Sequence, residues 1–225
     1  MEDTKMETTK ITVKLYEPLL DNFTKQMESA FLKRDAFLNH VIRGELAYLE
    51  REMTGLRQSS VARLHVSRSL KRLGTKTVNI TVDKEVAARL KAVVEESNMV
   101  RDAFLNRLIM LLRSTDEVLD FFQVPLEVNS SGLRDAPGLS TSPLTAIEQI
   151  IGDPLSYLRT VAQQHGPGDL YLRELPAKMA GLCCYLEDKR VPGTKEFDLE
   201  ARDRLVSLDG PDALPESSRE VTDRV

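Results

Sequence analysis

The chain has 225 residues, which is enough for one or two domains with a buried core. Hydrophobic residues make up 41% of it and charged residues 29%, a balance typical of soluble globular proteins. No apolar run approaches the roughly 18 residues of a membrane span, and the polar first ten residues do not resemble a signal or transit peptide. We therefore expect a cytoplasmic protein that makes no use of a membrane.

Cysteine and histidine are too few and too scattered to predict a disulfide framework or a metal site. Cys183 and Cys184 are adjacent, whereas His40, His65 and His165 lie far apart. Adjacent thiols cannot join distant segments, and a tetrahedral metal site needs ligands that this chain lacks. We expect two reduced thiols in a strand, and neither a metal nor another cofactor.

The net charge of −4 hides an uneven distribution of charge. Residues 1–120 carry +2 and residues 121–225 carry −6. Residues 53–82 contain no acid but six basic residues, which are Arg57, Arg63, Arg68, Lys71, Arg72 and Lys76. Such a local field can attract an anionic partner although the whole chain is acidic.

The sequence contains an internal duplication. The hexapeptide Arg-Asp-Ala-Phe-Leu-Asn occurs at residues 34–39 and again at 101–106, an offset of 67 residues. The same offset aligns the apolar residues on both sides of it without a gap, for example Ile11 with Val78 and Phe23 with Leu90. We infer one unit at residues 10–52 and a second at residues 77–122.

Each unit begins with alternating apolar and polar residues, which predict a half-buried strand at residues 10–16 and another at 77–83. Two amphipathic helices follow in each unit. The first helix is expected to begin at Glu17-Pro18 in one unit and after an N-cap at Asp83 in the other. It ends at a polar break, Ser29-Ala30 or Ser97-Asn98. The order in each unit is strand, helix, helix.

A unit with one strand can neither pair that strand nor cover its helices, so the two units must combine. We predict antiparallel pairing of residues 10–16 with 77–83, with the apolar side on four helices and the polar side exposed. The fold class is mainly α with short β-strands. A two-stranded ribbon of this kind has the width to enter the DNA major groove.

These two units resemble the ribbon-helix-helix family of bacterial DNA-binding proteins, here as a tandem pseudo-dimer in one chain. The resemblance implies a transcription regulator that binds double-stranded DNA. It implies that the outward strand residues read bases, and these are Lys10, Thr12, Lys14, Thr77, Asn79 and Thr81. It also implies that the start of each second helix, near Lys33-Arg34 and Val100-Arg101, holds a backbone phosphate.

The chain departs from this family at the start of that helix. The family often has a small hydroxyl residue there, whereas this chain has Asp35 and Asp102. An aspartate prefers to cap the helix and repels a phosphate at close range. Arg34 and Arg101 either offset this repulsion or form surface ion pairs with their own aspartates.

Residues 53–76 form a basic linker between the units, and the sequence is compatible with two structures for it. It is a solvated linker, or it contains a short basic helix, because Val61, Leu64, Val66 and Leu70 have helical spacing. In the second reading Arg68, Lys71, Arg72 and Lys76 contact DNA phosphates. Because the two strands differ, one chain is expected to read an asymmetric DNA element.

The C-terminal half is acidic and carries fewer signals. Residues 123–143 are predicted to be a linker, and residues 1–9 and 206–225 tails, the latter disordered. Residues 144–205 are predicted to form a small α+β element used for oligomerisation or protein docking. Its helix at 144–164 is interrupted at 152–154, and residues 170–175 and 180–186 form a hairpin.

No catalytic motif is present, because the glycines are scattered and the histidines isolated, so we do not expect an enzyme. The competing hypothesis is an interaction or assembly protein, antitoxin-like or used in plasmid maintenance. In that case the C-terminal part binds a protein partner, and the ribbon serves assembly.

Overall fold

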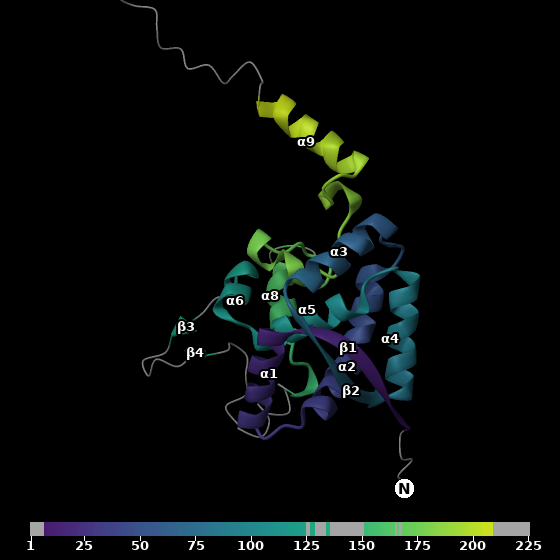
Figure 1. Cartoon of the computed structure of the whole chain (residues 1–225). Helices are drawn as coiled ribbons and strands as arrows, with labels where there is room; N and C mark the ends of the chain where they lie inside the picture. Colours follow the sequence, from purple (N-terminus) through teal and green to yellow (C-terminus); the bar gives the residue numbers. More distant parts are fainter. Residues whose placement is uncertain are drawn as a thin grey trace, which may run out of the picture. The chain divides into compact units, whose positions relative to one another are not determined.

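The computed structural model describes residues 7–124, 127–128, 134–135, 151–164, 166 and 168–208 (Figure 1). The expected helix at 144–150, His165, most of the linker at 123–143, and the tails at 1–6 and 209–225 lie outside the described residues. Among the described residues, no helix has both the length and the apolar character that crossing a membrane requires.

The first and second units have the same order of elements. The first contains β1 (Thr8–Tyr16), α1 (Glu17–Ser29) and α2 (Arg34–Met53), and the second contains β2 (Thr75–Asp83), α4 (Lys84–Glu96) and α5 (Arg101–Arg113). Between them lies α3 (Ser60–Arg72), so the basic linker contains a helix. The ends predicted for the first helix of each unit are confirmed.

Strands β1 and β2 pair in antiparallel orientation and form a two-stranded ribbon. Thr12 lies opposite Asn79 at the centre of the ribbon, and Tyr16 lies opposite Thr75 at one end. The predicted antiparallel pairing is therefore confirmed. Val13, Leu15, Ile80 and Val82 are buried, since alternate residues of a strand point to opposite faces.

The inner face of the ribbon packs on the helices. In Figure 1 the ribbon crosses in front of α2 and α5, with α1 on one side and α4 on the other. The core below it consists of apolar side chains from all four helices, among them Phe23, Leu46, Leu90 and Phe104. The mainly helical fold with a short antiparallel sheet matches the predicted class.

The repeated hexapeptide connects each unit to the strand of the other. Arg34 donates to the carbonyl of Asn79 (3.3 Å), and its equivalent Arg101 donates to the carbonyl of Thr12 (2.5 Å). Thr12 and Asn79 are themselves 67 residues apart, so the two contacts are related by the same offset as the repeat.

The last residue of the hexapeptide repeats this pattern at the ends of the strands. Asn39 Oδ1 accepts from the amide of Asp83 (2.9 Å), and Asn106 Oδ1 accepts from the amide of Tyr16 (2.7 Å). Tyr16 and Asp83 also differ by 67 positions. In both copies, polar side chains of the hexapeptide therefore hold the strand of the other unit, which gives a structural role to the repeated arginine and asparagine.

The chain divides into two compact regions, called compact units here, and the first of them contains both repeated units and ends at Leu186. Its remaining elements follow α5. They are α6 (Asp116–Phe121), the two-residue strands β3 (Glu127–Val128) and β4 (Arg134–Asp135), α8 (Ser156–Gln164) and the 3-10 helix η1 (Ala177–Leu182). Leu155, Leu158, Val161 and Leu170 belong to the same core as the helices of the two repeated units. The second compact unit begins at Glu187 and contains η2 (Asp188–Arg190) and α9 (Lys195–Leu208).

The predicted hairpin at residues 170–175 and 180–186 is wrong, because neither segment is a strand. In this segment, side chains instead of a neighbouring strand form hydrogen bonds with the backbone amides and carbonyls. The Glu52 carboxylate accepts from the amides of Leu170, Tyr171 and Leu172 at 3.0, 2.7 and 3.2 Å. Arg107 donates to the carbonyls of Leu170 and Arg173.

One smaller expectation is also wrong, and another is confirmed in position only. Cys183 and Cys184 do not lie in a strand but directly after η1, where both are buried and free. Asp83 occupies the N-cap position of α4 but makes no capping hydrogen bond. Its carboxylate accepts instead from Asn39 (2.7 Å) and from Arg43, so a cross-unit contact replaces the local one.

Candidate nucleic-acid interface

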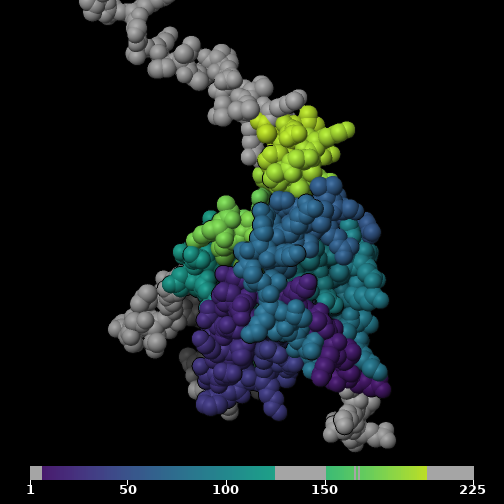
Figure 2. Space-filling view, viewed as in Figure 1, coloured from purple at the N-terminus to yellow at the C-terminus, as the bar shows by residue number. Residues whose placement is uncertain are grey.

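The outer face of the ribbon carries the six residues singled out from the sequence. Lys10, Thr12, Lys14, Thr77 and Asn79 are exposed, and Thr81 is half-buried. They form three cross-strand pairs, in which Lys10 faces Thr81, Thr12 faces Asn79 and Lys14 faces Thr77. In the space-filling view both strands form part of the open surface (Figure 2). The structure therefore brings all six side chains onto one face.

The central pair of this face is held by a hydrogen bond. The hydroxyl of Thr12 donates to Asn79 Oδ1 at 2.8 Å. Within the described residues, Asn79 Nδ2 has no hydrogen-bond partner. The Thr12 hydroxyl therefore orients the amide while leaving its donor free, and the second lone pair of Oδ1 can still accept.

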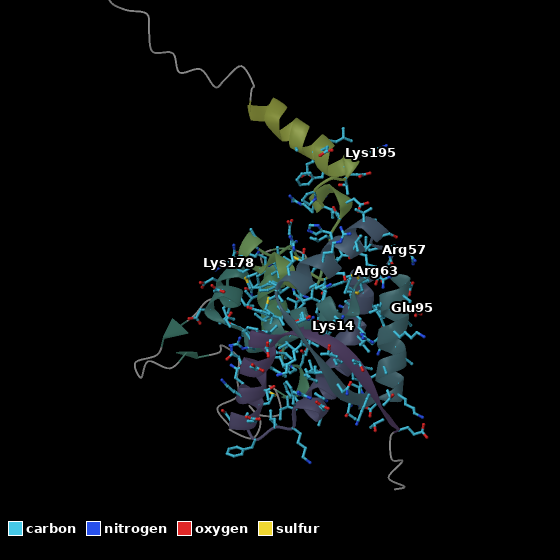
Figure 3. All side chains as sticks on the ribbon, viewed as in Figure 1. Lys14, Arg57, Arg63, Glu95, Lys178 and Lys195 are labelled. Carbon is cyan, nitrogen blue, oxygen red and sulfur yellow. The ribbon has the colours of Figure 1, made fainter. Side chains whose placement is uncertain are left out.

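The two lysines of β1 supply free positive charge. Lys10 and Lys14 form no ion pair with any residue that the structure describes. Figure 3 labels Lys14 on the part of the ribbon that faces the viewer. Strand β2 contributes only neutral polar groups to this face, so the two halves of the face differ in charge.

The arginines beside the ribbon are partly occupied by internal contacts. Arg34 pairs with Asp35 at 2.8 Å and Arg101 with Asp102 at 3.4 Å, so the ion pairs with their own aspartates are present. Both guanidinium groups also donate to the ribbon backbone. Each is still about one third exposed, which leaves room for a further contact.

The predicted capping role of Asp35 is wrong. Asp35 lies in the first turn of α2, and Lys33 occupies the N-cap position without a side-chain cap. Its carboxylate turns to the ribbon and accepts from the amide of Thr81 at 2.9 Å. Burial would raise the pKa of Asp35, but the Thr81 amide and the Arg34 guanidinium outweigh it and lower this pKa. The N-terminus of α5 likewise has no side-chain cap at Val100.

Helix α3 presents a basic surface next to the ribbon. Ser59 caps it by accepting from the amide of Ala62 at 3.0 Å, and Ala62, Val66 and Leu70 attach it to the core. Val61 and Leu64, expected on the apolar side, are 55% and 48% exposed. The phosphate candidates Arg68, Lys71, Arg72 and Lys76 are exposed, and Lys76 lies 3.6 Å from Glu17.

His65 lies on α3 between the basic side chains of this helix. Partial burial lowers its pKa below the ordinary value of 6.5, and the charges of Arg72 and Arg68 lower it further. Burial is the larger of the two causes, because it penalises the charged form of the imidazole.

Two basic residues of the acid-free segment have structural roles instead. Arg57 donates to the carbonyls of Glu95 and Glu96 at the end of α4, and Arg63 donates to Asn98 at 2.8 Å. Figure 3 labels Arg57, Arg63 and Glu95 close together, away from Lys14. Arg57 thereby satisfies open carbonyls at the end of α4, as basic side chains often do. Arg63 instead contacts the side chain of the residue that follows the C-cap Ser97.

Sequence reasoning missed a group of buried charged residues in the core. Glu45, 2% exposed, accepts from Arg159 and Tyr171, and Arg107 is fully buried. A signal existed, since Arg107 lies among the buried apolar residues of α5 and Glu45 lies on the buried side of α2. These residues are buried and hold the segment around residue 171. Within the described ranges, no three His, Cys, Asp or Glu side chains gather as a metal site would require.

Comparison with known proteins gives no match to a family model, a curated protein or a solved structure.

Proposed function

We propose that this chain is a sequence-specific double-stranded DNA-binding protein, a transcription regulator of the bacterial ribbon-helix-helix type. In this proposal the two units form a tandem pseudo-dimer, and the ribbon of β1 and β2 enters the major groove. The observation that carries it is the outer face of the ribbon. It is polar and open to solvent, whereas apolar side chains of the inner face, among them Val13, Leu15 and Ile80, are buried in the core.

The chemistry of this face suits base edges. A lysine donates to guanine O6 or N7, so Lys10 and Lys14 favour guanines near the β1 side of the groove. An asparagine reads adenine by donating to N7 and accepting from N6. Asn79 keeps its Nδ2 donor free for such a contact. Because Thr12 already orients the Asn79 amide, less side-chain entropy is lost when it binds a base.

Phosphate contacts accompany base readout. The uncapped N-terminus of α2 near Lys33, the uncapped N-terminus of α5 near Arg101, and the exposed basic residues of α3 supply positive potential beside the ribbon. Such contacts make affinity fall steeply with salt. Arg34 and Arg101 also hold the ribbon backbone, so their removal is expected to weaken the ribbon as well as DNA binding.

One chain should read an asymmetric site. Strand β1 offers lysine, threonine and lysine, whereas β2 offers threonine, asparagine and threonine at the paired positions. A ribbon made from two identical strands would suit a palindrome. Here the two halves of the footprint meet different chemistry, so their preferred bases differ.

The test is the selection of binding duplexes from a random DNA pool by the full chain. The selection is repeated with Lys14→Ala, Asn79→Ala and Lys25→Ala, the last a matched loss of one exposed lysine on α1 away from the ribbon. We expect one asymmetric motif. Each ribbon variant should lose preference at its own base pairs, and Lys25→Ala should retain the whole motif.

Two results would count against the proposal. If no motif emerges and only weak, salt-sensitive binding is found, the ribbon is not a sequence reader, and a protein partner becomes the better hypothesis. If a motif emerges but the ribbon variants keep it, another surface reads the DNA.

A further inference from the structure

A cavity of about 310 Å³ lies where one end of the ribbon meets η1. Four separate segments line it, namely the junction of β1 and α1, the end of α3, the end of α5 with the start of α6, and η1. It is separate from the outer face of the ribbon, and no contact described above uses it. Its volume is at the lower end of the range for small-molecule sites.

The walls of the cavity are mainly apolar. Tyr16, Leu19, Leu73, Met110, Met179 and Leu182 contribute to them. Glu117 and Lys178 line the cavity as well, but they form an exposed ion pair with each other at 2.7 Å, so their charges offset. The charge that remains in the lining is that of Arg113.

Arg113 has an unused hydrogen-bonding capacity. Its Nε is buried and has no hydrogen-bond partner, and its guanidinium forms no ion pair with a residue that the structure describes. Pro18 and Leu19 of the first turn of α1 also line the cavity and extend its apolar wall.

We propose that this cavity binds a small monocarboxylate with an apolar body. The carboxylate pairs with the Arg113 guanidinium, which matches a carboxylate in planar, bidentate geometry. The apolar body lies against Leu19, Met110 and Leu182. Both parts of the ligand contribute to binding, because the carboxylate pairs with Arg113 and the apolar body packs against the apolar walls.

The experiment is isothermal titration of the full chain, without DNA, with octanoate and with 3-phenylpropanoate. Acetate tests the carboxylate without the apolar body, and octanol tests the body without the charge. Arg113→Met removes the guanidinium, and Lys25→Met is the matched control that removes an exposed positive charge elsewhere on the surface. Asn22→Trp offers a second variant, since it places a large side chain at an exposed position of α1 that lines the cavity.

We expect saturable binding of at least one of the two probes, with one molecule per chain. Affinity should fall about tenfold or more in Arg113→Met, as the loss of a charge-assisted pair requires, and stay unchanged in Lys25→Met. Asn22→Trp should also abolish binding, so the test holds even if Arg113→Met does not fold. Acetate and octanol should bind more weakly than the matching full ligand.

The proposal is overturned if neither probe binds, or if Arg113→Met and Asn22→Trp fold and bind as the unchanged chain does. Equal affinity for octanol and octanoate would also overturn it, because the cavity would then be a nonspecific apolar site. Since no DNA is present, these outcomes are independent of the proposed DNA-binding function.

Discussion

Asn106 is the point at which the second unit holds the strand of the first, and its removal tests the structural role of the repeated hexapeptide. The side chain is fully buried in α5. Its Oδ1 accepts from the amide of Tyr16 at 2.7 Å, and its Nδ2 donates to the carbonyls of Lys14 (2.9 Å) and Asp102 (2.7 Å). Asn106→Ala therefore leaves two backbone groups of β1 without their side-chain partner.

The expected cost follows from these contacts. A buried polar group left unpaired costs about 1–3 kcal/mol, so two such groups at the low to middle part of that range amount to about 3 kcal/mol. This is a large share of the free energy of unfolding of a typical protein, which is about 5–15 kcal/mol. Urea unfolding of the full chain, followed by circular dichroism, measures it as a lower midpoint with an unchanged slope.

Asn39→Ala is the matched control, because Asn39 is the equivalent residue of the first unit. It is only half-buried, and its partner is Asp83. Water can replace part of the hydrogen bonding that Asn39→Ala removes, so we expect the free energy of unfolding to fall by about 1 kcal/mol. The reasoning would be refuted if Asn106→Ala were no more destabilising than Asn39→Ala.

Three further variants test other parts of the structure. Arg107→Met removes three hydrogen bonds to the carbonyls of Leu170 and Arg173; we expect a loss of about 3 kcal/mol and faster proteolysis at residues 168–186. Phe31, 96% exposed at φ 58°, is strained, so Phe31→Gly should raise the free energy of unfolding by about 1 kcal/mol. The lowered pKa of His65 means that the unfolded chain binds its proton first, so stability should fall as pH drops below 6.5. His65→Gln should flatten that slope in urea titrations at several pH values, and an unchanged slope would contradict this reasoning.

The parts of the fold that were predictable depend on local periodicity. Alternation at Ile11, Val13 and Leu15 identified both the strand and its buried face, because the side-chain period of a strand leaves no other choice once one face is apolar. The repeat then supplied the second strand and the antiparallel pairing. The candidate readers followed from the same alternation, since they are the residues between the apolar ones.

The parts that were missed depend on side chains distant in sequence. Residues 170–186 are apolar enough to suggest two strands, but Glu52 and Arg107 take up the backbone groups that a ladder would need. Asp83 has the right position for a helix cap, but Asn39 and Arg43 compete for its carboxylate. No local pattern reveals these long-range partners. The same holds for the cavity beside Arg113, which forms only when four separate segments meet.

The most direct measurement of the central claim is methylation interference on the selected duplex. Methylation of guanine N7 blocks an acceptor in the major groove, where Lys14 is proposed to donate. For the unchanged chain, methylation at one guanine should weaken binding about tenfold. For Lys14→Ala, methylation of that guanine should have no further effect. If no guanine N7 in the site interferes, or if both proteins give the same pattern, Lys14 does not read the major groove.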